Sequence, residues 1–170
     1  MSKPNRIIKY AYLCRMKRLL TYFIPFLLFL TSLSACEKDD VCLEKGTPKL
    51  IIKFFDAQQT TLVKKIDNLS LIALPLTDTL VFKNVDSVAI PLNVNENNCV
   101  FKMIKGNNSD KVQFEYTTEE VFISKSCGYK SIFHNLQIDV TPDTDNWIKS
   151  IDIIKHNIII DTVYHVKIFH

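Results

Sequence analysis

Lys111-Val112-Gln113-Phe114-Glu115-Tyr116-Thr117 is the segment of this 170-residue sequence that most clearly indicates a β-fold. Apolar and polar side chains alternate strictly along it. Successive side chains of a β-strand point to opposite faces of a sheet, so this period of two predicts a strand with one buried and one solvated face.

The same alternation recurs at residues 50–55, 88–93, 99–104 and 164–168, and clusters of turn-forming residues lie between these stretches, at 77–78, 84, 93–98, 106–110 and 141–146. Pro91 cannot donate a backbone hydrogen bond, which favours an edge strand there. Residues 118–124 allow a helical turn, but Val121, Phe122 and Ile123 favour a strand. About eight to ten short strands predict an all-β, immunoglobulin-like antiparallel β-sandwich; a small β-barrel is the alternative.

The N-terminal region has the composition of an export signal. Six basic and no acidic residues lie in residues 1–35, followed within that range by the apolar run 23–30 and then Leu33-Ser34-Ala35-Cys36. The apolar core from 19 to 30 is too short for a transmembrane helix, and Pro25 interrupts it. We therefore predict a lipoprotein signal peptide at 1–35 (with the start at Met16), a lipidated tether at 36–48 and a β-sandwich domain at 49–170.

The segment that follows the predicted cleavage point indicates a location. It looks like a bacterial lipoprotein N-terminus, in which lipid is attached to the sulfur of Cys36, and each buried acyl CH₂ contributes about 0.8 kcal/mol of membrane affinity. Lys38-Asp39-Asp40 resembles the signal that moves Bacteroidetes lipoproteins to the outer face of the outer membrane. The expected location is the outer membrane, surface-exposed or periplasm-facing, with the membrane as a partner through the lipid.

Charge and glycine content exclude several classes of function. Without residues 1–35 the chain has 15 basic and 18 acidic residues, a formal charge of −3 rather than +3. That balance gives no basic face for nucleic acid. Only three glycines are present, too few for a phosphate-binding loop. We predict no nucleic-acid partner and no cofactor.

Three cysteines follow Cys36, and export would place them where disulfides form. Cys99 alternates with Phe101 and Met103 on a predicted core face, where a free cysteine acts as a small hydrophobe. Cys42 and Cys127 lie in irregular segments that are easier to bring together. The predicted disulfide therefore joins Cys42 to Cys127.

No catalytic or metal site emerges from the remaining residues. The histidines form no motif with a cysteine and lack zinc-ligand spacing; His134 is expected in the core, and His165 and His170 are expected to point outward. The neighbouring Glu119 and Glu120 would face opposite sides of a strand. Asp143 and Asp145 are interpreted as part of a solvated turn rather than a calcium-binding loop. Trp147 is interpreted as a residue of the core or its rim rather than a surface on which a sugar stacks.

Three tripeptides resemble O-glycosylation sites of exported Bacteroidetes proteins: Asp78-Thr79-Leu80, Asp86-Ser87-Val88 and Asp161-Thr162-Val163. The acceptors would be Thr79, Ser87 and Thr162. The motif is short, so the alternative is that these are ordinary surface residues.

Several segments together resemble a known family: residues 36–44, residues 47–56 and Ser126-Cys127-Gly128-Tyr129. They are similar to an uncharacterised family of small Bacteroidetes lipoproteins, the domain-of-unknown-function family numbered 6452. The resemblance covers most of the chain after Cys36. It implies no activity and transfers no active-site residue.

An anchor, a compact β-domain and no catalytic set predict a non-enzymatic binding or accessory module at the cell envelope, with an unknown protein or glycan as partner. The alternative is a small envelope hydrolase or carbohydrate-active enzyme whose carboxylates are scattered along the sequence. A structural envelope component is a third interpretation.

Overall fold

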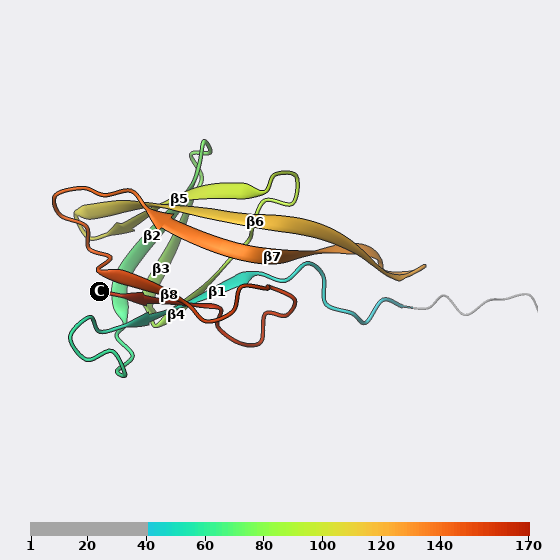
Figure 1. Cartoon of the computed structure of the whole chain (residues 1–170), viewed down its shortest axis with the longest axis horizontal. Coiled ribbons are helices and arrows are strands. Elements are labelled where there is room, and N and C mark those ends of the chain that lie inside the picture. The colour runs from blue at the N-terminus through green and yellow to red at the C-terminus, as the bar shows by residue number, and fades with distance from the viewer. Residues whose placement is uncertain (1–40) are drawn as a thin grey trace, which may run out of the picture. The chain divides into compact units, whose positions relative to one another are not determined.

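A computed structural model describes residues 41–170, and within them the chain forms nine β-strands and no helix (Figure 1). The strands are β1 (Leu50–Phe55), β2 (Ile66–Leu74), β3 (Thr79–Val85), β4 (Ser87–Ile90), β5 (Asn98–Lys105), β6 (Asn108–Ser124), β7 (Gly128–Val140), β8 (Ser150–Ile153) and β9 (Val166–Phe169). No helix long and apolar enough to cross a membrane occurs in this part of the chain.

The strands form two sheets, with the orders β4-β1-β9-β8 and β3-β2-β5-β6-β7. Neighbouring strands are antiparallel except β1 and β9, which run parallel with Ile52 opposite Val166. The all-β sandwich predicted from the alternating pattern is therefore confirmed, with one parallel pair that periodicity alone does not reveal. β4 is an edge strand, as the proline predicted, and Pro91 lies directly after its last residue, where it interrupts no strand pairing.

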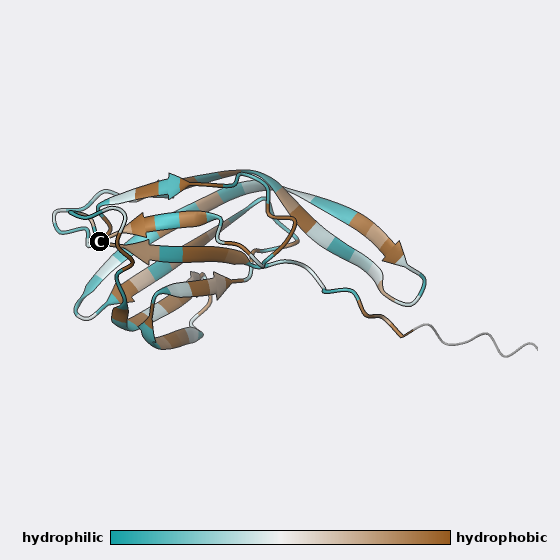
Figure 2. Cartoon of the chain, turned by 90° about the horizontal axis from the view of Figure 1, so that it is seen from below, coloured by the Kyte–Doolittle hydropathy of each residue, from teal (hydrophilic) through white to brown (hydrophobic). Residues whose placement is uncertain are grey.

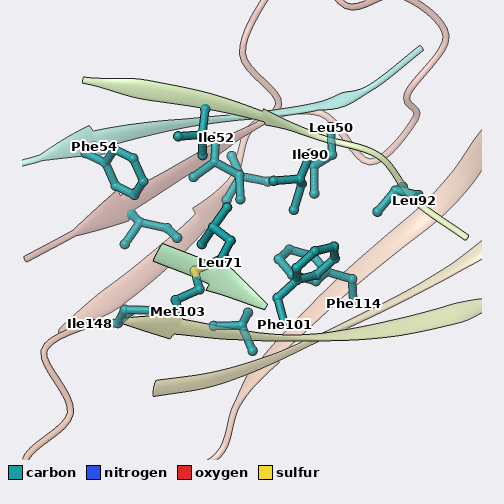
Figure 3. Packing of buried hydrophobic residues seen from close by; sticks show 14 of the residues in the cluster. Leu50, Ile52, Phe54, Leu71, Ile90, Leu92, Phe101, Met103, Phe114 and Ile148 are labelled. Carbon is teal, nitrogen blue, oxygen red and sulfur yellow. The ribbon is translucent and has the colours of Figure 1, made fainter. Parts of the chain in front are cut away.

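The core lies between the two sheets. Leu50, Ile52 and Phe54 of β1 are fully buried, as their alternation predicts. They face residues of the five-stranded sheet that include Leu71, Met103 and Phe114 (Figure 3). The hydropathy colouring in Figure 2 shows the same alternation as successive brown and teal bands along the strands. One face of each sheet supplies the apolar area whose burial stabilises the domain.

β6 and β7 form a hairpin that extends beyond the other strands of its sheet (Figure 1). Residues 118–124 belong to β6, so the strand preference of its β-branched and aromatic residues outweighs the helical alternative. Gly128 begins β7 with a φ of 70°, a left-handed conformation that glycine adopts without strain.

Candidate functional site

A pocket of about 650 Å³ opens between the β2–β3 connection and the segment that joins β4 to β5. Its volume falls in the range of small-molecule sites, roughly 300–1,000 Å³. Most of its lining is apolar: Leu71, Ala73, Leu74, Pro75, Leu76 and Leu80 from β2, β3 and their connection, and Pro91, Leu92, Cys99, Val100 and Phe101 from the second segment and β5.

The floor and the mouth of the pocket differ in exposure. Leu71, Leu92 and Phe101 are buried and form the floor. Leu76 and Leu80 remain 61% and 44% exposed, although they lie in and just after a turn where polar residues are usual. Neighbouring apolar side chains left in contact with water mark binding surfaces more often than isolated ones do.

Cys99 lies in the wall of this pocket. It is half-buried and is a free thiol within the described chain. Burial raises the pKa of the Cys99 thiol above its ordinary value, so the sulfur is protonated at neutral pH. Nearby, burial and then Cys99 raise the pKa of Tyr116, whose hydroxyl donates a hydrogen bond to the Asn93 carbonyl at 2.9 Å. A protonated thiol without a histidine in the pocket lining is a poor nucleophile.

The predicted disulfide is present. Cys42 and Cys127 are bonded, with a Cα–Cα distance of 4.9 Å. Close by in sequence, the Thr47 hydroxyl accepts a hydrogen bond from the Ser131 N–H at 3.1 Å. The bond and this contact attach the segment before β1 to the extended β6–β7 hairpin.

Four residues of the predicted anchor and export signal, Cys36, Lys38, Asp39 and Asp40, lie outside the described residues. So does the predicted signal peptide at 1–35. Their roles stay predictions from the sequence.

The three predicted glycosylation acceptors differ in accessibility. Thr79 is exposed at the start of β3, and Thr162 is exposed in the loop before β9. Ser87 is half-buried in β4, where its hydroxyl donates to the Asp86 carboxylate at 2.9 Å. A glycosyltransferase would therefore reach Thr79 and Thr162 more easily than Ser87.

The prediction that His134 lies in the core is wrong. The β6–β7 register shifts so that Glu115 pairs with Gln137 but Thr117 pairs with His134, which leaves one extra residue on β7. Asn135 has a φ of 56° within this bulge. The bulge reverses the alternation, and His134 instead contacts the Glu119 carboxylate, with its Nε2 2.9 Å from Oε2.

The prediction that His165 and His170 point outward is also wrong, because both side chains are buried. His165 Nδ1 accepts a hydrogen bond from the Ile51 N–H at 3.1 Å, and Nε2 donates to the Ile160 carbonyl at 2.9 Å. Burial lowers the pKa of His165, which agrees with this neutral form. Both ring nitrogens are occupied by backbone partners, so His165 has no lone pair left for a metal.

His170 is buried like Ile168 and Val166, which lie two and four residues earlier and share its side of the strand. Its ring packs edge-on against Phe54 and Trp147. Burial and then the neighbouring Lys105 lower the pKa of His170. Among residues 41–170, no three His, Cys, Asp or Glu side chains form a metal-binding group.

Trp147 is buried, as predicted, and its Nε1 donates to the Met103 carbonyl at 3.1 Å. The side chain that positions this segment was not found from the sequence. Asp110 is completely buried, and its carboxylate accepts hydrogen bonds from the backbone N–H groups of Trp147 and Ile148, at 3.4 and 2.8 Å. Asp143 and Asp145 lie in an exposed turn, where the Asp145 N–H donates to the Asp143 side chain at 3.0 Å.

The pocket, too, was not predicted from the sequence. Its signal is the pair of segments Leu74-Pro75-Leu76 and Pro91-Leu92, in which leucines adjoin prolines that interrupt strands. Leu76 and Leu92 lie outside the strands, and Leu74 has a strand neighbour on one side, where it pairs with Val100 of β5. Which two interruptions face each other depends on strand order, and an alternating pattern does not specify that order.

The fold and the pocket define a small β-sandwich protein with an apolar cavity at one sheet. The chain belongs to the family described as "Family of unknown function (DUF6452)", whose model matches residues 68–170. This confirms the resemblance found from the sequence at the level of the family. No curated protein and no solved structure is significantly similar to the chain.

Proposed function

We propose that this protein is a membrane-anchored lipoprotein of a Bacteroidetes-type outer membrane and that its β-sandwich binds a small apolar ligand without catalysis. The observation that carries the binding role is the pocket of about 650 Å³ with buried leucine and phenylalanine side chains at its floor. Such concave, mostly apolar cavities are where small ligands bury most of their surface.

The same lining argues against a glycan as the pocket's ligand. Sugars are recognised through many hydrogen-bonding groups and through aromatic faces, whereas Phe101 is the aromatic residue among the lining side chains of the described chain. The protonated Cys99 thiol further favours binding over thiol chemistry. A glycan or protein partner would have to use another surface.

A carboxylate-dependent hydrolase is the second candidate, because Asp78 and Glu96 both line the pocket. Such an enzyme would use one carboxyl as the acid and the other as base or nucleophile. Its substrate would need an apolar body to match the walls. Turnover of an apolar ester or glycoside that is lost in Asp78→Asn or Glu96→Gln would favour this candidate over simple binding.

The binding role predicts a saturable site for a neutral apolar probe. The processed chain in phosphatidylcholine nanodiscs, with ¹³C-labelled leucine methyls, should show shifts of the Leu71, Leu80 and Leu92 signals on titration with 1-octanol. Ala73→Trp should weaken binding at least about tenfold, because the indole fills part of the cavity.

The matched control is Ala89→Trp, since Ala89 is exposed on β4 and does not line the pocket. It should leave the octanol titration unchanged. Shifts that fail to saturate, or equal affinity in both tryptophan variants, would contradict a pocket site.

The anchor is supported by the sequence around Cys36, and its test is chemical. Cells that express the full precursor should incorporate radiolabelled palmitate into the protein, which should fractionate with membranes. Cys36→Ser should abolish both labelling and membrane fractionation, since the acylated sulfur is removed.

Cys14→Ser is the matched control, because Cys14 lies within the predicted signal peptide. It should be labelled like the wild type. Equal labelling of the Cys36→Ser protein would refute the lipoprotein assignment.

A further inference from the structure

The mouth of the apolar pocket carries charge of one sign. Asp78, from the β2–β3 connection, and Glu96, from the β4–β5 connection, line it and are exposed, whereas the apolar floor is buried. The other polar lining residues are the amides Asn93 and Asn98. Within the described chain, no lysine, arginine or histidine lines this pocket.

The excess of acidic residues at the pocket mouth is, in proportion, much larger than the excess along the rest of the chain. From residue 36 onward basic residues are nearly as numerous as acidic ones, 15 against 18. Two carboxylates from segments about eighteen residues apart are brought to one opening by the pairing of β2 with β5. Low-dielectric walls beside such charges strengthen the field at the opening.

We infer that the pocket selects an apolar ligand that bears a positively charged amino group, with the apolar body on the leucine-lined floor and the ammonium at Asp78 and Glu96. The inference rests on the proposed binding role of the pocket and adds the chemical class of the ligand. The same mouth repels carboxylates and phosphates, so a free fatty acid is the disfavoured ligand.

The magnitude follows from the exposure of the two acidic side chains. A solvent-exposed charge pair typically changes affinity by a factor of about two to five, in either direction according to sign. With two carboxylates, an alkylammonium and an alkylcarboxylate of equal chain length should differ in affinity by roughly tenfold. The difference should shrink as salt is raised, because exposed charges are screened.

The test compares octylammonium, 1-octanol and octanoate at pH 7 by the shifts of the Leu71, Leu80 and Leu92 methyls of the processed chain in neutral nanodiscs. Octylammonium should bind about tenfold more tightly than octanoate, with octanol between them. The Asp78→Asn/Glu96→Gln double variant should bind all three with similar affinity.

The control for net charge is Asp139→Asn/Glu120→Gln, which neutralises two exposed acidic side chains outside the pocket. It should keep the preference for octylammonium. Octanoate binding as tightly as octylammonium, or a preference that survives in the pocket variant, would overturn the charge selection while the binding role stands. Failure of all three probes to bind would overturn the binding role and the charge selection with it.

Discussion

Replacement of both Cys42 and Cys127 by serine should lower the free energy of unfolding by about 4 kcal/mol. The bond joins residues 85 positions apart, so its loss frees a long loop in the unfolded chain. In the folded protein, loss of the bond also releases the segment before β1 from the β6–β7 hairpin. Backbone amides near the bond, such as those of Val121 and Ser131, should then exchange with solvent faster.

Urea unfolding followed by the fluorescence of Trp147, the single tryptophan, measures the effect. The midpoint should fall by about 2 M for a slope of about 2 kcal/mol/M. Wild type treated with reductant should behave like the double variant, which separates the bond from the serine side chains.

Cys99→Ser is the control, because Cys99 is not part of the bond. It should shift the midpoint much less. A double variant with the wild-type midpoint would show that the bond does not stabilise the domain.

Asp110→Ala should lower the free energy of unfolding by about 3 kcal/mol, because two buried N–H groups, those of Trp147 and Ile148, lose a charged acceptor. An alanine leaves these donors without a partner in a region closed to water. Asp110→Asn should cost less, since its amide oxygen still accepts one of the two bonds. Urea unfolding again provides the measurement.

Asp139→Ala is the matched control, because Asp139 is exposed on β7. It should change stability by no more than about 0.5 kcal/mol. If Asp110→Ala were equally mild, the buried carboxylate would not hold the segment before β8 to β6.

The two effects differ in how far the sequence predicts them. The disulfide was predictable because Cys99 falls on an apolar face, which left two cysteines in irregular segments. The buried faces of β1, β4, β5 and β6 were predictable because apolar residues recur at every second position along these strands. Asp110, by contrast, lies on the same buried side of its strand as Val112 and Phe114, two and four residues later. Its hydrogen-bond partners were not predictable, because they are backbone groups far away in the sequence.

The histidines show the limit of the same reasoning. One extra residue at Asn135 reverses the side-chain direction on either side of it, and so His134 leaves the core. A bulge depends on the partner strand as well as on its own sequence. His165 is buried because the Ile51 N–H and the Ile160 carbonyl bind its ring, and neither partner lies next to it in the sequence.

The all-β class, the buried faces of β1, β4, β5 and the first part of β6, the cysteine pair and the family resemblance were all predictable from the sequence. The class and the strand faces follow from local alternation, because a strand shows its pattern within a few residues. The cysteine pair follows from the position of Cys99 on an apolar face, and the resemblance follows from short motifs. Three features are visible only in the folded chain: the parallel β1–β9 pair, the buried carboxylate of Asp110 and the pocket with Asp78 and Glu96 at its mouth. Each of these requires segments distant in sequence to meet, and strand order, which periodicity does not encode, determines which segments do.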